Sequence, residues 1–431
     1  MPGSSTAAQI PWESFYLDPA LRSLIAAALA HNHDLRLALL RVEEARAAHG
    51  IQSAERLPAI GLGSSHARVR VPGDLNASGR SAVAGDQEVY VGLSTWELDL
   101  WGRVRNLSQA ALENYLATDA GRRGAQAMVI RQVALGYLAL RSLDERLALT
   151  DRTIASREES LRIFTRRVQM GATSRYALTQ VQTLVYQAQA IGTQLRQQRA
   201  QQAHALQQLT GREIGAFEQP ASDPVVLREL PEGLPSDLLA QRPDVVAAEH
   251  SLQAARANVA AARAAFLPRI ALTGRFGTAS AELDGLFASG SRAWQFMPTI
   301  SLPIFDGGLR QSSLDLQAAR QNMAVAQYEK TVATALREVL DALSSRATLH
   351  EQTLVLAAQR DALKERSRLA QLRYSQGASP YLDVLDAERD LLSAEQQLVQ
   401  SREAVLGAQV ALYAALGGGA PSQSSTPTPT P

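Results

Sequence analysis

Hydrophobic and polar positions follow two different periods along this chain, and the two periods appear in the same order twice. Between residues 21 and 29 the apolar side chains recur every three or four residues, which predicts an amphipathic helix. This helical segment ends near Arg56, because Pro58 cannot continue it. A second helical segment begins at Pro243, a favourable first position, and stops before Pro268.

Each helical segment is followed by two stretches in which apolar and small or polar residues alternate. These stretches predict strands over about residues 57–71 and 88–99 in the first copy, and 268–279 and 293–303 in the second. About ten residues is the length that a tilted strand needs to cross a bilayer. Four strands leave open edges that lipid does not tolerate, whereas the twelve strands of a trimer can close a barrel.

A glycine then introduces a very long helical pattern in each copy, over about residues 104–168 and 309–374. At 1.5 Å per residue each helix has a length of about 100 Å. Tight turns at Gly171 and Gly377 lead into returning helices of about 35 residues. Because glutamines cover most faces of residues 179–208, this helix suits a rod, a coiled coil or the wall of a water-filled tube.

The two copies are related by a duplication with a period of about 200 residues. The run Leu57-Pro58-x-Ile60-x-Leu62 recurs as Leu267-Pro268-x-Ile270-x-Leu272, and Arg167-x-x-x-Gly171-Ala172 recurs as Arg373-x-x-x-Gly377-Ala378. The expected organisation is an N-terminal equatorial arm, a first repeat, an equatorial linker, a second repeat and a disordered tail. The arm spans residues 1–18 and the first repeat residues 19–210. The linker spans residues 211–236, the second repeat residues 237–416 and the tail residues 417–431.

Composition narrows the classes of function. With 43 basic and 42 acidic residues the net charge is +1, which argues against a broad electrostatic grip on nucleic acid. The absence of cysteine excludes disulfides, thiol catalysis and cysteine-ligated metals. The chain has no run of 18 apolar residues, so no membrane-spanning helix is expected. Its first residues lack the features of a signal peptide, as expected of a cytoplasmic protein or of a mature or engineered form.

Enzymatic chemistry has little support in the sequence. Gly61-Leu-Gly63 lacks the third glycine of a dinucleotide-binding loop, since His66 occupies that place. The seven histidines do not form the spacing of a zinc site. No catalytic residue, metal or cofactor is therefore expected. The patterns leave open a soluble coiled-coil or helical scaffold with surface hairpins, or a periplasmic adaptor, as alternatives to a channel.

Several motifs, in order, resemble the TolC-like outer-membrane factor family, and in particular its OprM-type branch. The resemblance covers about residues 10 to 418 and rests on Trp96-Glu97-Leu98-Asp99-Leu100-Trp101-Gly102, Leu234-Pro235-Ser236-Asp237-Leu238-Leu239, Arg242-Pro243-Asp244-Val245, Ala265-Phe266-Leu267-Pro268, Leu302-Pro303-Ile304-Phe305-Asp306-Gly307-Gly308 and Arg373-Tyr374-x-x-Gly377. It implies a mainly α-helical fold with a transmembrane β-barrel. The barrel would have twelve strands, four from each chain of a homotrimer, on a long periplasmic helical tunnel with a mixed equatorial region.

The resemblance also implies a function and partners. Members of this family are exit ducts of tripartite efflux pumps, located in the outer membrane with the tunnel in the periplasm. They conduct drugs or other toxic small molecules passively from an inner-membrane RND-type transporter and a periplasmic adaptor, or membrane fusion protein. Many members of the OprM-type branch carry a lipid on an N-terminal cysteine, and this cysteine-free chain has no residue for that attachment.

Finally, the resemblance implies which residues close and dock the tunnel. Leu382 would supply an apolar plug and Asp386 an acidic ring in the aperture, while Tyr374 and Arg389 match positions that tether the closed state. Because Gln180 takes the place of Asp386 in the first copy, a trimer would have three ring carboxylates, which can bind a cation. The adaptor-docking tips would be Gly171, Ala172, Thr173, Ser174, Gly377, Ala378 and Ser379.

Overall fold

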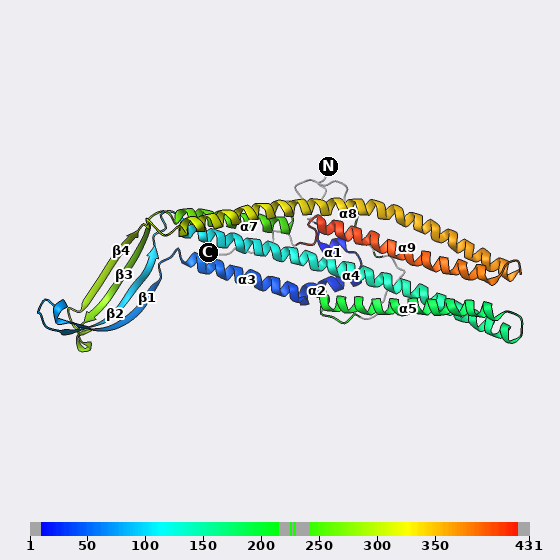
Figure 1. Cartoon of the computed structure of the whole chain (residues 1–431), viewed down its shortest axis with the longest axis horizontal. Helices are drawn as coiled ribbons and strands as arrows, with labels where there is room; N and C mark the ends of the chain where they lie inside the picture. The colour runs from blue at the N-terminus through cyan, green and yellow to red at the C-terminus, as the bar shows by residue number, and fades with distance from the viewer. Residues whose placement is uncertain (1–9, 215–224, 226, 230–240, 421–431) are drawn as a thin grey trace. The chain divides into compact units, whose positions relative to one another are not determined.

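In a computed structural model of the chain, the described residues are 10–214, 225, 227–229 and 241–420 (Figure 1). The helices are α1 (Trp12–Phe15), α2 (Pro19–His31), α3 (His33–Ala54), α4 (Arg103–Gln169), α5 (Arg175–Thr210), α7 (Pro243–Ala264), α8 (Leu309–Ser375) and α9 (Tyr381–Ala415). The strands are β1 (Ile60–Val71), β2 (Ala82–Glu97), β3 (Arg269–Ser280) and β4 (Arg292–Ser301). Among the helices of the described residues, none is both long and apolar enough to pass through a membrane.

The chain forms two compact units. One contains residues 1–40, 120–246 and 330–431, and the other contains residues 41–119 and 247–329. Each unit draws on both copies of the duplication, so the repeats predicted from the sequence are interleaved in space and are not separate bodies. Most of the predicted equatorial linker, including the motif at residues 234–239, lies outside the described residues, as do residues 1–9 of the arm and 421–431 of the tail.

The two β-hairpins of the second unit form a single antiparallel sheet in the order β1-β2-β3-β4. The central pairing joins the copies, with Val91 opposite Phe276, and the register shifts between Leu93 and Trp96. Strand β2 begins at Ala82, earlier than the start near residue 88 that alternation predicted. The physical reason is that Ala82, Ala84 and Gly85 carry too little side chain to make the alternation visible.

The two faces of this sheet differ in chemistry. One row across the strands consists of Leu62, Val91, Phe276 and Trp294, which are aligned by the strand register. Leu62 is 80 % exposed and Phe276 is 66 % exposed. Because side chains alternate between faces along a strand, the neighbouring positions point to the opposite side. The sheet therefore presents large apolar side chains on one face, with no covering layer in the second unit.

The first unit has its main apolar core where α1 and α2 pack against α4 and the end of α9. The rings of Phe15 and Tyr413 stack with their centroids 4.0 Å apart, and Tyr16 meets Tyr413 edge-on at 6.0 Å. Asp18 caps α2 by accepting from the backbone of Leu21 at 3.0 Å, and its carboxylate also accepts from the Tyr137 hydroxyl at 3.0 Å. This core fixes the base from which the two helical hairpins, α4–α5 and α8–α9, extend (Figure 1).

Candidate functional site

The two hairpins end in the same turn. Gly171 and Gly377 adopt left-handed backbone conformations, with φ of 70° and 71°, which a glycine adopts without strain. In the first turn the amide of Ala172 donates to the Arg167 carbonyl at 2.8 Å, and in the second the amide of Ala378 donates to the Arg373 carbonyl at 2.8 Å. These are Schellman turns, which satisfy the last carbonyls of α4 and α8. The duplicated motif of the sequence therefore specifies duplicated turns.

The turns differ in how the returning helices begin. Ser174 caps α5, because its hydroxyl oxygen accepts from the backbone of Ala177 at 3.2 Å. Pro380 occupies the corresponding place before α9 and offers no side-chain cap. The predicted tip residues thus lie at the hairpin ends, where the structure places Ala172, Thr173, Ser174, Ala378 and Ser379 beside the two glycines.

The first hairpin is joined to the second through Tyr374. The Nη1 atom of Arg167 on α4 donates to the hydroxyl of Tyr374 on α8. The Tyr374 ring lies 4.8 Å from the ring of Tyr381 on α9, measured between centroids. Tyr381 in turn contacts Phe164 on α4, with 4.6 Å between the ring centroids. The aromatic rings and the arginine together form a contact between the hairpins, which we term the tip latch: Phe164, Arg167, Tyr374 and Tyr381.

The other predicted aperture residues lie on the first turns of α9. Leu382 is 41 % exposed, so its side chain is available to a neighbouring molecule. Asp386 lies one turn further and pairs with Arg389 at 3.1 Å. Arg389 also contacts Asp390, whose pKa is held below its ordinary value by a hydrogen bond from Arg366 on α8. Within the chain, Arg389 therefore pairs along its own helix, while Tyr374 reaches the other hairpin.

Sequence reasoning did not find a buried charged group behind the tip latch. Arg157 on α4 is only 2 % exposed and donates from Nη1 to the Leu184 carbonyl at 2.8 Å. Glu388 on α9 has its pKa raised by burial, an effect that Arg157 partly offsets. Tyr381 and Glu388 are seven positions apart and so share one helix face, but no local signal places Arg157 of α4 beside them.

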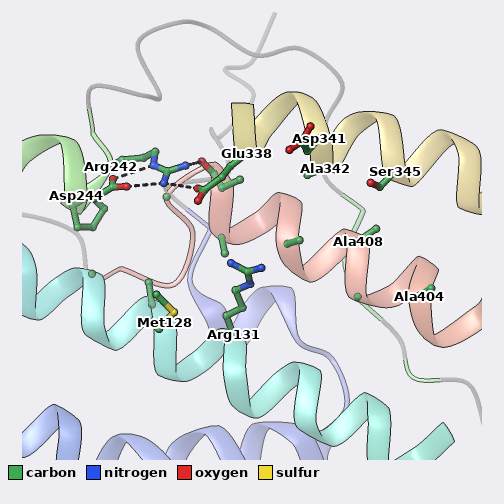
Figure 2. Close-up of a pocket in the computed structure, with 18 of the residues that line it drawn as sticks. Met128, Arg131, Arg242, Asp244, Glu338, Asp341, Ala342, Ser345, Ala404 and Ala408 are labelled. Carbon is green, nitrogen blue, oxygen red and sulfur yellow. Dashed lines mark hydrogen bonds and ion pairs between the residues drawn. The ribbon is translucent and has the colours of Figure 1, made fainter. Parts of the chain in front are cut away.

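A second polar cluster lies at the other end of α9, beside a pocket of about 670 Å3 (Figure 2). Arg242 is buried and forms a two-pronged contact with Asp244, at 3.0 and 2.7 Å. It also donates to Glu338 on α8 at 2.7 Å and to the Ala415 carbonyl at 2.9 Å. Arg131 projects into the same region from α4 (Figure 2). Arg242 therefore ties the start of α7 to the end of α9 and to α8.

Neither cluster has the donor set of a metal centre. In the part of the chain that the structure describes, no three histidine or acidic side chains converge as metal ligands would. The best-defined polar groups are arginines paired with carboxylates or carbonyl oxygens, which are arrangements that hold helices together. These polar contacts join neighbouring helices to one another.

Comparison with known proteins gives consistent likenesses over nearly the whole chain. The sequence profile of the family described as outer membrane efflux protein matches residues 24–212 and 234–418. The chain is 44 % identical to the solvent efflux pump outer membrane protein SrpC of Pseudomonas putida, over 94 % of this chain and 87 % of that protein. It is 42 % identical to the outer membrane protein OprJ of Pseudomonas aeruginosa, over 95 % of this chain and 86 % of OprJ.

A solved structure shares the fold. The open state of the Neisseria gonorrhoeae MtrE outer membrane channel is 37 % identical, with a TM-score of 0.87 over 97 % of this chain and 94 % of that one. The likeness therefore extends through the helical hairpins and the sheet, and not only through one motif.

Proposed function

The chain belongs to the outer membrane efflux protein family, and we propose that it serves as the homotrimeric exit duct of a tripartite pump. It is an efflux-pump channel of the bacterial outer membrane. The fold is that of the TolC-like channels: mainly α-helical, with a four-stranded antiparallel contribution to the membrane part. The trimer, the gating residues and the particular partners are the parts that we propose.

The observation that carries the proposal is the sheet. Its end strands are β1 and β4, and its row of Leu62, Val91 and Phe276 is exposed. An open strand edge in lipid leaves several backbone groups without hydrogen bonds, at a cost of several kcal/mol each. If β4 of one copy pairs with β1 of the next, three copies close a twelve-stranded barrel with the apolar row toward lipid. This pairing of end strands satisfies both the open edges and the apolar face.

We assign the resting aperture to the hairpin tips. Leu382 supplies the apolar constriction and Asp386 the acidic ring, and the tip latch through Tyr374 holds the hairpins together in the closed state. Arg389 holds the Asp386 carboxylate in place by pairing with it. Three such carboxylates around one axis attract cations. Opening then requires the hairpins to separate at the latch.

The proposed partners are those that the family resemblance implies. The turns at Gly171 and Gly377 are the ends of the hairpins and form the docking surface for a periplasmic adaptor, which connects to an inner-membrane RND-type transporter. The duct itself catalyses no reaction and holds no cofactor, so the driving force comes from the transporter. Similar proteins are named as parts of solvent and antibiotic efflux pumps. We therefore propose small, toxic organic compounds as the cargo class.

Imaging of single particles in mild detergent, with the mass measured by light scattering, tests the architecture. We expect a threefold particle with a barrel at one end and a helical tube at the other. A monomer or dimer that stays soluble without detergent would instead be a helical scaffold, and would overturn the proposal.

Planar-bilayer recordings test the aperture separately. Asp386→Ala should raise the conductance and reduce cation selectivity, and Leu382→Ala should raise the conductance without changing selectivity. Tyr176→Ala is the matched control, because Tyr176 corresponds to Leu382 in the first copy. A trimer in which all three variants conduct like the parent would keep the channel but discard the assigned aperture.

A further inference from the structure

The face of the sheet opposite the apolar row carries a built cluster of its own. By strand alternation this second face contains Gly63 of β1, Glu88 and Tyr90 of β2, and Arg275 of β3. These side chains come from both copies of the duplication and meet where β2 pairs with β3. If the apolar row faces lipid, as the proposed function requires, this cluster faces the water-filled interior of the barrel.

Glycines make room for Tyr90. A Cβ atom added at Gly63 would lie 2.7 Å from the Tyr90 ring, and one added at Gly92 would lie 3.0 Å from it. Real Cβ atoms essentially never approach another heavy atom within 3.0 Å, so any other residue at Gly63 would displace the ring. The tyrosine therefore lies over the backbone of β1 and β2 and does not project into the interior.

Arg275 is placed over that ring. Its Cζ lies 5.4 Å from the centre of Tyr90, which is within the range of a cation–π contact. Its Nη1 donates to Glu88 at 2.8 Å, and its Nη2 donates to the Gln295 side chain at 2.7 Å. Three side chains from β2 and β4 thus fix one guanidinium, although it stays about one-third exposed.

The charges of this face show what the arginine does there. Its acids on β2 are Asp86, Glu88 and Glu97, and its arginines on β3 are Arg269 and Arg275. Arg269 is paired with Glu97 at 2.7 Å, at the end of the sheet. Arg275 is then the cation that offsets one of the two acids, Asp86 and Glu88, in the central part of the face. Without it, three copies would place six carboxylates around the barrel interior, a strong attraction for cationic solutes.

We propose that Arg275, paired with Glu88 and seated on Tyr90, is a selectivity determinant of the barrel that lowers the negative charge of its interior. This inference rests on the proposed function, because it needs the barrel. The wall with Arg275 retains cationic organic cargo less strongly than the more acidic wall that would remain without it. The ring of charge pairs is separate from the Asp386 ring at the tips.

The experiment reads the local potential with a single cysteine, since the chain has none of its own. Ala293→Cys places the thiol on the same face as Gln295, and Ala293 is opposite Gly277. The purified trimer in lipid vesicles is treated with two methanethiosulfonates of similar size, one ending in a sulfonate and the other in a trimethylammonium. The ratio of the two reaction rates reports the local charge and does not depend on whether the aperture is open.

Added to Ala293→Cys, Arg275→Gln should lower the anion-to-cation rate ratio roughly three- to ten-fold, and Glu88→Gln should raise it by a similar factor. Both shifts should shrink in 1 M salt, where charge is screened within about 3 Å. Arg275→Lys keeps the charge, so its ratio should stay near that of the parent. Unchanged ratios, or shifts in the same direction for both glutamine variants, would overturn the proposal.

A failure of the underlying function gives a different result. Trp294→Cys lies on the apolar face of the same strand, where lipid should protect it from both reagents. Equal reaction at positions 293 and 294, or reaction at 294 alone, would mean that the sheet is not a barrel wall in this orientation. Protection at 294 with unchanged ratios at 293 would keep the barrel and reject only the role of Arg275.

Discussion

Removing one hydroxyl group from the tip latch should open the channel. Tyr374→Phe deletes the oxygen that accepts from Arg167 and leaves the ring against Tyr381, 4.8 Å away between centroids. The change therefore separates the hydrogen bond from the aromatic packing. It also leaves the backbone turn at Gly377 untouched.

The size of the effect depends on the environment of the bond. A hydrogen bond to a charged donor contributes about 1.5–3 kcal/mol, but this one is exposed to solvent and is worth about 1 kcal/mol after screening. If the three chains of a trimer open together, the closed state loses about 3 kcal/mol. That corresponds to roughly a hundred-fold change in the ratio of closed to open channels.

Planar-bilayer recordings measure this ratio as the open probability of single channels. Tyr176→Phe is the control, because Tyr176 lies just after the first turn, is 74 % exposed and is outside the latch. The reasoning is refuted if Tyr374→Phe and Tyr176→Phe have the same open probability as the parent. A three- to five-fold increase would mean that the chains open one at a time.

Three further outcomes are expected. Arg242→Gln should speed backbone hydrogen exchange at the end of α9 about ten-fold, because the Ala415 carbonyl loses its hydrogen-bond donor. Mass spectrometry measures this exchange, and an unchanged rate would contradict the proposed role of Arg242 in holding α9. Burial raises the pKa of Glu388 above its ordinary value of 4.5, so the packed tip binds a proton more tightly than an open one. Closure should strengthen as the pH falls from neutral to about pH 5 and weaken as it rises through the raised pKa, and recordings of Glu388→Gln should show no such dependence. Gly377→Val should distort the turn that docks the adaptor, because valine is strained at φ 71°. We expect antibiotic susceptibility to increase while trimers still form. Normal susceptibility would mean that this turn is not part of the docking surface.

Much of the helical part could be predicted from sequence, because its signals are local. The long helices lie within about a residue of the ranges that periodicity gave, and the glycines at 171 and 377 mark both turns. The strands were harder. Alternation located the hairpins but placed the start of β2 too late, and no local signal predicts that β2 pairs with β3, since the partners lie in different copies.

The contacts within the candidate site were largely beyond prediction, because they join residues far apart in the chain. Tyr374 was expected at a tether from the family resemblance, but its partner Arg167 comes from the other hairpin. Arg242-Pro243-Asp244 was visible as a motif, yet the role of Arg242 depends on Glu338 and on the last carbonyls of α9. Burial of Arg157 depends on α5 and α9 packing against α4, which periodicity alone does not specify.

The two tips of each chain share a backbone turn but not their side chains. Ser174 caps one returning helix, while Pro380 leads into the other, which alone carries Leu382 and Asp386. A trimer would therefore display six ends of two alternating kinds. Six identical partner molecules around the trimer would occupy two non-equivalent kinds of position. Three partner molecules would bind at only one of the two kinds of hairpin end. A duplication that kept the turn and diversified the helix after it would in this way give a symmetric trimer two different kinds of docking position.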